Sequence, residues 1–194
     1  DGERMTDIDI KAFVSLLLVA GGETTDKAMA NMFANLIANP DQLEAVRNDY
    51  SIIDCAFAET LRHSPPVHMV MRQPEVDIEI HGVEIPAGST VTGMVAAANR
   101  DPRQYSDPDS FNIFREDLDV SKAFTSGATH AAFGLGRHFC VGAMLAKVEV
   151  ETGAYQLLDA MDDIAFDGGP PEPRGVFTRA PTSMPLRFKP KPRV

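Results

Sequence analysis

The sequence predicts a mainly α-helical protein with small β-sheets. Apolar residues recur at helical spacing from about Asp7 to Ala38 and again from Gly142 to Met161, whereas apolar and polar residues alternate strictly from Val76 to Ile80. The helical patterns are long and the alternating one is short, so we expect the sheets to be small. Of the 194 residues, 44% are hydrophobic and 24% are charged, which indicates a folded chain and not a disordered one.

The first predicted helix begins at Thr6, which with Asp9 resembles a capping box. The first half of this helix is apolar on almost every side, which predicts burial by several neighbours; its apolar residues are Phe13, Val14, Leu16, Leu17, Leu18 and Val19. Gly21 and Gly22 interrupt the pattern at mid-length. Each glycine inside a helix costs about 1 kcal/mol relative to alanine, so the pair needs a reason.

Three further helices are expected. Pro40–Asn48 and Ser51–His63 are short, and Pro65-Pro66 stops the second. The stretch Asn99–Thr129 is rich in Asp, Pro, Ser and Gly and predicts a long irregular segment packed against something large. The last helix, Gly142–Met161, is expected to direct these residues inward: Leu145, Val148, Leu157, Leu158 and Met161.

The predicted strands are short. Val76–Ile80 turns back through two residues into Val83–Ile85, which indicates a hairpin, and Thr90–Val95 is a third strand. Near the C-terminus we expect a strand pair formed by Val176-Phe177 and Leu186–Phe188.

Charge and cysteine content limit the function classes. The chain has 28 acidic against 18 basic residues, a net charge of -10, which argues against nucleic acid or an anionic membrane surface as a partner. Its longest apolar run, Phe13–Ala20, is too short to span a bilayer. The two cysteines, Cys55 and Cys140, form no disulfide framework, and Cys55 is expected to be a small core residue. We therefore expect a soluble, cytoplasmic protein.

The first chemical motif is the segment Phe133–Gly142, directly before the last helix. Gly134 and Gly136 let the backbone turn tightly and approach a planar group. Cys140 lies just before the helix N-terminus, where free N–H groups favour a thiolate. Beside the cationic Arg137-His138 pair, such a thiolate suits an iron ligand near the acidic edge of a cofactor. The alternative is a buried structural cysteine.

The second motif is Glu59 and Arg62, whose spacing places both charges on one helix face. Most such pairs are exposed and contribute well under ~1 kcal/mol. Other residues crowd this helix with apolar surface, however, so a buried, networked pair is the alternative; they are Ile53, Ala56, Phe57, Thr60 and Leu61.

The third motif is Ala20–Thr25, in the middle of the long helix. Its glycines permit a local opening of the hydrogen-bond ladder, a threonine hydroxyl can fill the opening, and the adjacent carboxylate can carry protons. The alternative is a helix kink used only for packing.

Taken together, in this order and at these separations, the three motifs resemble the cytochrome P-450 superfamily, the haem-thiolate monooxygenases, and especially its soluble bacterial members. The resemblance covers essentially the whole chain. It implies that residues 1–194 form a single C-terminal portion of that fold, with the long central helix, the Glu/Arg helix, the β-hairpins, the cysteine loop and the following helix. The same resemblance implies that these residues do not include the N-terminal half of the family fold.

The resemblance assigns the cofactor site. It implies haem b, with Cys140 as the axial iron ligand and with His138 and Arg72 in contact with the propionates. An anionic sulfur donates electron density to iron and favours O–O cleavage. The remaining positions that match the family's haem-binding segments are Phe133, Gly134, Gly136, Gly142, Ala20 and Gly21.

The resemblance also assigns the supporting and reacting groups. Glu59 and Arg62 match the invariant helix pair, and Arg115 is expected to complete their network. Thr24 matches the key alcohol of oxygen activation and Glu23 its acid partner, so both would deliver protons. By position, the substrate contacts would be Val67, His68, Met69, Val70, Val176 and Phe177.

The implied partners are a small organic substrate and an electron donor. No phosphate-binding or dinucleotide-binding fingerprint occurs in the sequence, so electrons are expected from a separate ferredoxin or flavoprotein. A plain interaction module would require three independent motif coincidences.

The competing hypothesis is a truncated, non-catalytic fragment without stable haem or a complete substrate pocket. By the same resemblance, the family's N-terminal half supplies further propionate contacts and the lid of the distal pocket. Without that half, the apolar helix at Phe13–Ala20 would be exposed, which predicts self-association or a missing N-terminal partner segment.

Overall fold

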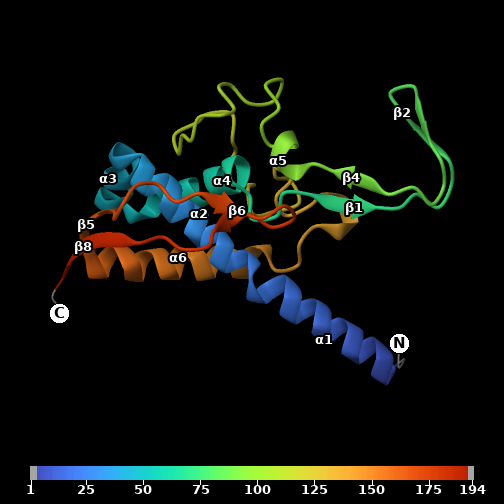
Figure 1. The fold of residues 1–194 in the computed structure, drawn as a ribbon, viewed down its shortest axis with the longest axis horizontal. Helices are drawn as coiled ribbons and strands as arrows, with labels where there is room; N and C mark the ends of the chain where they lie inside the picture. The colour runs from blue at the N-terminus through green and yellow to red at the C-terminus, as the bar shows by residue number, and fades with distance from the viewer. Residues whose placement is uncertain (1–3, 192–194) are drawn as a thin grey trace.

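The computed structural model describes residues 4–191 and shows a mainly helical chain with, within those residues, four two-stranded antiparallel sheets (Figure 1). The α-helices are α1 (Asp7–Gly22), α2 (Thr24–Ala38), α3 (Pro40–Asn48), α4 (Ile53–His63), α5 (Val95–Ala98) and α6 (Ala143–Ala160). Two 3₁₀ turns are η1 (Tyr50–Ile52) and η2 (Gly136–His138). The strands are β1 (Val70–Arg72), β2 (Ile78–Ile80), β3 (Val83–Ile85), β4 (Val91–Gly93), β5 (Met161–Phe166), β6 (Pro173–Arg174), β7 (Ala180–Pro181) and β8 (Leu186–Pro190).

The core forms where α2 packs against α4 and α6 (Figure 1). Each helix contributes a face of fully buried side chains: Met32 and Leu36 from α2, Phe57 and Leu61 from α4, and Val150 and Leu158 from α6. The irregular segment predicted over Asn99–Thr129 lies against this core and buries Tyr105, Ile113 and Phe124. These buried side chains are what keep a long segment without regular secondary structure in one conformation.

The long N-terminal helix is divided in two at Glu23. Gly21 and Gly22, predicted to interrupt it, are the last helical residues of α1, and the ladder breaks one residue later. The predicted capping box is present, since the Thr6 hydroxyl accepts from the Asp9 amide and the Asp9 carboxylate accepts from the Thr6 amide.

The expected burial of α1 is wrong for the described chain. Among residues 4–191, α1 has no buried side chain, and Leu18 and Val19 are 71% and 73% exposed. The reason is that α1 meets the other elements chiefly at its junction with α2 and extends away from the core (Figure 1). No helix in this part of the chain is long and apolar enough to cross a membrane.

The β-hairpin is present as β2 and β3, in antiparallel register with Glu79 opposite Glu84. The third predicted strand is β4, shorter than expected, because the helical turn α5 begins at Val95. Its partner is β1, with Val70 opposite Gly93 and Arg72 opposite Val91. The sequence pattern did not predict β1.

The C-terminal strand pair differs from the prediction. Leu186–Phe188 lies in β8, but its partner is β5, directly after α6, and not Val176-Phe177. The latter two residues form the turn between β6 and β7 instead. Gly175 permits this turn: its φ is +110°, and a methyl group there would overlap the Thr178 carbonyl oxygen.

The inward face of α6 was also predicted incorrectly. Leu145 and Val148 are 63% and 53% exposed, and Leu157 is also exposed. Leu158 is buried as expected, and Met161 is half-buried in β5. The buried face of α6 consists of Ala143, Val150, Ala154 and Leu158, because α2 and α4 contact the helix on that side.

Candidate functional site

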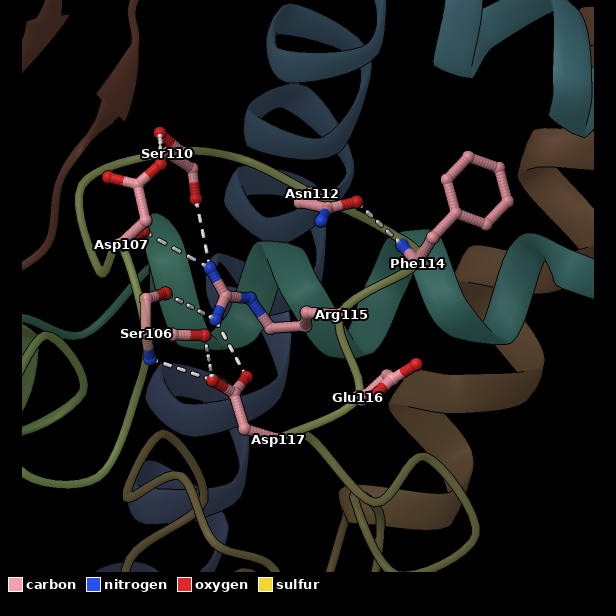
Figure 2. A pocket seen from close by; sticks show the side chains of 8 residues that line it. All are labelled: Ser106, Asp107, Ser110, Asn112, Phe114, Arg115, Glu116 and Asp117. Atoms are coloured by element: carbon pink, nitrogen blue, oxygen red, sulfur yellow. Dashed lines mark hydrogen bonds and ion pairs between the residues drawn. The ribbon is translucent and has the colours of Figure 1, made fainter.

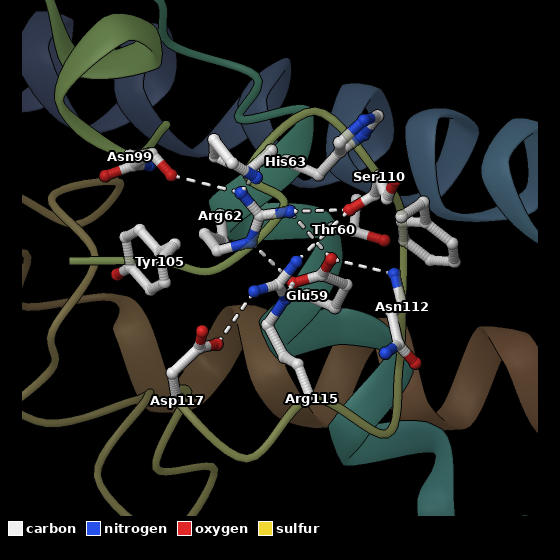
Figure 3. Close-up of polar contacts among 12 residues, drawn as sticks. Glu59, Thr60, Arg62, His63, Asn99, Tyr105, Ser110, Asn112, Arg115 and Asp117 are labelled. Carbon is white, nitrogen blue, oxygen red and sulfur yellow. Dashed lines mark hydrogen bonds and ion pairs between the residues drawn. The ribbon is translucent and has the colours of Figure 1, made fainter. Parts of the chain in front are cut away.

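Glu59 and Arg62 form a buried ion pair on α4 (Figure 3). The side chains are 1% and 0% exposed, and the guanidinium bonds the carboxylate through Nε and Nη2 at 2.7 and 2.8 Å. A guanidinium has five N–H groups, and the other three donate to the carbonyl oxygens of Asn99, Pro108 and Ser110 at 3.1, 2.8 and 3.0 Å. Complete pairing is what makes a buried charge tolerable.

Arg115 joins this pair from the irregular segment, as Figure 3 shows. Its Nε lies 3.1 Å from the Glu59 carboxylate, and its Nη1 donates to Asp117 at 2.7 Å. Burial disfavours the Arg115 charge, but Asp117 and Glu59 outweigh it and raise the pKa of Arg115. The Asn112 amide also donates to Glu59, at 2.9 Å. One carboxylate therefore holds two arginines and a loop amide.

A hollow of about 530 Å³ opens beside Arg115. Figure 2 shows the side chains that line it. Its lining residues are Ser106, Asp107, Ser110, Asn112, Phe114, Arg115, Glu116 and Asp117. The two Nη atoms of Arg115 already donate to Asp117 and to the Ser106, Asp107 and Ser110 carbonyls. We interpret the hollow as the outer surface of the buried network and not as a ligand site.

The cysteine loop is a tight turn ahead of α6. Its neck is closed by the Cys140 amide, which donates to the Phe133 carbonyl at 2.8 Å. Gly134 and Gly136 have φ of +76° and +64°, a region that side-chain-bearing residues rarely adopt. Cys140 is exposed, so the structural alternative of a buried cysteine does not describe it. Cys55, by contrast, is half-buried, and burial raises the pKa of its thiol.

Several other expected cofactor contacts lie within the cysteine loop, at the start of α6 or in the last turn of α1. His138 is exposed within η2, and Phe133 is half-buried with its ring 6.0 Å from that of Phe139. Gly142 is the N-cap of α6, and a Cβ there would lie 3.8 Å from the Cys140 sulfur. Ala20 and Gly21 lie in the last turn of α1.

Arg72 lies on β1 and is exposed. Its guanidinium donates to the neighbouring Met71 carbonyl and forms no ion pair within residues 4–191. An exposed cation without a carboxylate partner is available to an anionic group.

At the α1–α2 junction, the Thr24 hydroxyl donates to the Ala20 carbonyl at 2.8 Å. The Thr24 hydroxyl thereby provides a donor for the Ala20 carbonyl oxygen near the residue at which the helix is interrupted. Glu23 forms an ion pair with Lys27 at 2.7 Å, so its carboxylate is engaged one turn along α2.

The six expected substrate contacts fall into two segments that the structure brings together. The His68 amide donates to the Phe177 carbonyl at 2.9 Å, and Val67 bridges Thr178. Met69 and Val70 continue the first segment and are half-buried, whereas Val176 is 77% exposed in the second. Together the two segments form one surface that is apolar except for His68.

Sequence reasoning missed two buried amide side chains that join remote segments of the backbone. Gln42 of α3 donates to the Phe111 carbonyl and accepts from the Ile113 amide. Asn99 donates to the Leu61 carbonyl and accepts from the Ala131 amide. Nothing in the sequence pattern around Asn99 or Gln42 indicates these roles, because the partners of both side chains are backbone groups of remote segments.

The described residues fit a haem group. Haem iron already has four porphyrin nitrogens and takes its axial ligand from the protein, so one exposed thiol is a sufficient donor. Gly21 and Gly136 face open space, since a Cβ on either would meet nothing within 4 Å, and a flat ligand could approach the backbone there. Arg72 supplies an unpaired cation.

Comparisons with known proteins agree on one family. A family model described as Cytochrome P450 matches residues 1–162. Pulcherriminic acid synthase of Bacillus subtilis is 42% identical over 189 residues, which are 97% of this chain and 47% of that protein. The cytochrome P450 monooxygenase PikC of Streptomyces venezuelae is 40% identical over 194 residues, 97% of this chain and 44% of that protein.

A solved structure, that of cytochrome P450 CYP109Q5 from Chondromyces apiculatus, superimposes with a TM-score of 0.88 at 36% identity. It covers 98% of this chain and 47% of its own chain. The chain thus spans a little under half the length of the relatives that it matches.

Proposed function

The chain belongs to the cytochrome P450 family, and from this membership we propose that it forms the haem-ligand half of a haem-thiolate monooxygenase acting on a small organic substrate. The observation that carries the proposal is the exposed Cys140 thiol, held at the end of a glycine turn and just ahead of α6. Cys140 precedes the first residue of α6, Ala143, by three positions.

In the proposed site, the Cys140 sulfur would hold the iron of haem b, which would supply the oxygen-activating chemistry when bound. Arg72 and His138 pair with its anionic edge. Gly21 and Gly136 let it approach the backbone, because neither has a side chain to exclude it. The surface formed by Val67–Val70 and Val176-Phe177 contacts the substrate.

Thr24 is the proposed proton donor. Its hydroxyl donates to the Ala20 carbonyl, so its oxygen can accept a hydrogen bond from water. To relay a proton, the hydroxyl turns away from Ala20, gives its own proton and takes one from that water or from a protonated Glu23. Glu23 must first leave Lys27 to take part. This ion pair is partly exposed, and such pairs contribute only about 0–1 kcal/mol, so the separation is inexpensive.

Electrons come from a separate ferredoxin or flavoprotein, and we propose that the protein works in the cytoplasm. Both cysteines are unpaired, which agrees with a reducing compartment.

The second candidate function is that of a fragment without stable haem. The exposed apolar residues of α1 favour it, because a surface of that kind requires a covering partner. We propose that the cover is a polypeptide segment that corresponds to the half of the relatives that this chain does not match, which would also complete the distal pocket.

The experiment is the absorption spectrum of the reduced, CO-bound protein after haem loading. We expect a thiolate-type Soret band in the wild type and in Cys55→Ala, and loss of that band in Cys140→Ala. A thiolate-type band that survives in Cys140→Ala contradicts the proposed ligand. A wild type that retains no haem, alone or with the complementary segment, supports the fragment hypothesis.

A further inference from the structure

Asn99 is a buried polar residue whose backbone and side chain are both hydrogen-bonded to other segments. It is 1% exposed and follows α5, whose Val95 carbonyl accepts its amide at 2.9 Å. Its carbonyl oxygen accepts from Arg62 Nη1 at 3.1 Å. Its side chain donates through Nδ2 to the Leu61 carbonyl at 3.1 Å and accepts through Oδ1 from the Ala131 amide at 2.7 Å. One residue therefore contacts α4, α5 and the segment that precedes the cysteine loop.

On the α4 side, Asn99 completes the end of the helix. The last four carbonyls of a helix have no partner inside it and need other donors. The Leu61 carbonyl receives the Asn99 Nδ2 hydrogen, and the His63 carbonyl receives two from Arg100, at 3.2 and 2.8 Å. The same turn of α4 contains Arg62, so Asn99 is fixed to the buried ion pair by side chain and backbone alike.

On the side of Ala131, two further backbone hydrogen bonds connect the segment that Asn99 holds to Cys140. The Ala131 carbonyl accepts from the Gly134 amide at 3.0 Å, and the Phe133 carbonyl accepts from the Cys140 amide at 2.8 Å. The His130 side chain is 1% exposed, and its ring lies 6.1 Å from that of Phe133, which anchors the same segment by packing.

We propose that Asn99 is a positioning residue that holds the neck of the cysteine loop, Ala131–Phe133 with Cys140, at a fixed place relative to the Glu59–Arg62 pair. A short primary amide suits this task because its NH2 group donates and its carbonyl oxygen accepts within one rigid plane. Aspartate keeps only the acceptor for Ala131, and alanine keeps neither. The effect of Asn99 on haem ligation rests on the proposed function. The tether itself, meaning the hydrogen bonds by which Asn99 joins α4 to the cysteine loop, does not.

The test is amide hydrogen exchange on the full chain, with Asn99→Ala compared with Gln42→Ala. Gln42 is the matched control, because it is also a buried amide with one bond to a backbone carbonyl and one from a backbone amide, but it holds Phe111 and Ile113 instead of the loop. Both variants are measured at denaturant concentrations that give equal free energies of global unfolding, so that only local loosening differs.

We expect exchange of the Ala131 and Cys140 amides to be about tenfold faster in Asn99→Ala than in Gln42→Ala, the loss that one or two buried hydrogen bonds imply. Equal exchange at these amides in the two variants overturns the proposal. If Asn99→Ala does not fold, Asn99→Asp carries the test: it keeps the acceptor for Ala131 but loses the donor to Leu61, so the Cys140 amide must exchange faster than in Gln42→Ala. Equal exchange of this amide in Asn99→Asp and Gln42→Ala at matched global stability overturns the tether.

A second readout separates this proposal from the proposed function. In the haem-loaded protein, Asn99→Ala is expected to lower the fraction of the CO-bound form with the thiolate-type band, whereas Gln42→Ala leaves that fraction unchanged. If the Cys140 amide exchanges faster in Asn99→Ala than in Gln42→Ala, but the wild type shows no thiolate-type band, the tether is retained and the haem function is rejected. If Asn99→Ala changes neither the thiolate-type band nor the exchange of the Cys140 amide relative to Gln42→Ala, only the tether is rejected.

Discussion

Arg62 has the densest set of interactions among the residues of the site. All five of its N–H groups are paired, two with Glu59 and three with carbonyl oxygens from Asn99, Pro108 and Ser110. The Tyr105 ring lies 5.2 Å from its guanidinium carbon. Three segments that are distant in the sequence, namely α4, the turn after α5 and the loop at residues 108–110, are thus joined through one side chain.

Replacing Arg62 with methionine is expected to lower the free energy of unfolding by about 3 kcal/mol, because the buried Glu59 carboxylate loses its main partner. Urea denaturation measures the change. Arg103→Met is the control, since Arg103 pairs with Asp101 at the surface and its loss should alter stability little. Similar losses in the two variants would show that burial of the Glu59–Arg62 pair is not what stabilises the fold.

His130 predicts a pH dependence of stability. Burial lowers the pKa of His130 from 6.5 to about 4. The unfolded chain therefore binds a proton near pH 6.5, whereas the folded chain resists it down to about pH 4. Stability is complete above pH 6.5 and falls as the pH decreases, by about 2 kcal/mol between pH 6.5 and 4.5 for this group.

Denaturation at several pH values checks this expectation. His130→Asn is the informative variant, because its Oδ1 can replace Nδ1 as acceptor for the Ala132 amide and it does not titrate. The slope below pH 6.5 should become shallower but not vanish, since burial also lowers the pKa of His63 to about 4. An unchanged slope in His130→Asn would contradict the buried neutral state.

At the level of single residues, the sequence motifs were informative where the chemistry requires a particular side chain. The i, i+3 spacing of Glu59 and Arg62 with apolar neighbours left a buried pair as one alternative, and the structure buries both side chains. Asn99 and Gln42 could not be predicted in the same way, because their partners are backbone groups of remote segments and no local pattern identifies them.

Among the elements, the junction of α1 and α2 connects fold to function. The helix breaks at Glu23, the Thr24 hydroxyl donates to the Ala20 carbonyl, and the Lys27 amide donates to the Glu23 carbonyl. The interruption thus leaves a hydroxyl and a carboxylate at adjacent positions at the start of α2.

Thr24→Val is expected to raise severalfold the share of consumed oxygen that leaves as hydrogen peroxide in the complete haem-loaded enzyme, because valine fills the same space without a proton to give. Peroxide and product are quantified together. Thr25→Val is the neighbouring control and should leave the ratio unchanged. If Thr24→Val behaved like Thr25→Val, the junction would be only a kink in the helix.

Prediction of elements succeeded for long or strictly alternating segments and failed for the shortest ones. α2, α3, α4, α6 and the β2–β3 hairpin follow from periodicity. The two- and three-residue strands β1, β6 and β7 carry too few residues to show a period, and their pairing depends on tertiary contacts. The misassigned turn at Val176-Phe177 has this cause, since two apolar residues in a row look alike in a strand and in a turn.

For the molecule as a whole, the main feature is the contrast between a well-packed centre and an exposed apolar α1. Burial was predicted for α1 because its sequence is apolar all round, yet the neighbours that would bury it are not among the described residues. The apolar pattern of a helix predicts that the helix must be buried, but it does not identify the residues that bury it.

The haem-free chain alone is expected to self-associate through α1. Light scattering should give a mass above 21.1 kDa, the mass of one chain, and Leu18→Glu with Val19→Glu should lower it, because charges on these exposed positions prevent apolar contact. Val83→Glu, at an equally exposed position on β3, is the control and should not change the mass. A wild type that remains a monomer and binds haem tightly would contradict the need for a cover.

The central claim is that the Cys140 sulfur is the protein's ligand to haem iron. Resonance Raman spectroscopy of the haem-loaded ferric protein tests it most directly, by comparing protein grown with ordinary cysteine and with ³⁴S-labelled cysteine. We predict an iron–sulfur stretching band that moves to lower frequency with the heavier isotope, that remains in Cys55→Ala and that disappears in Cys140→Ser. A band that is insensitive to the isotope, or one that persists in Cys140→Ser, would contradict the account.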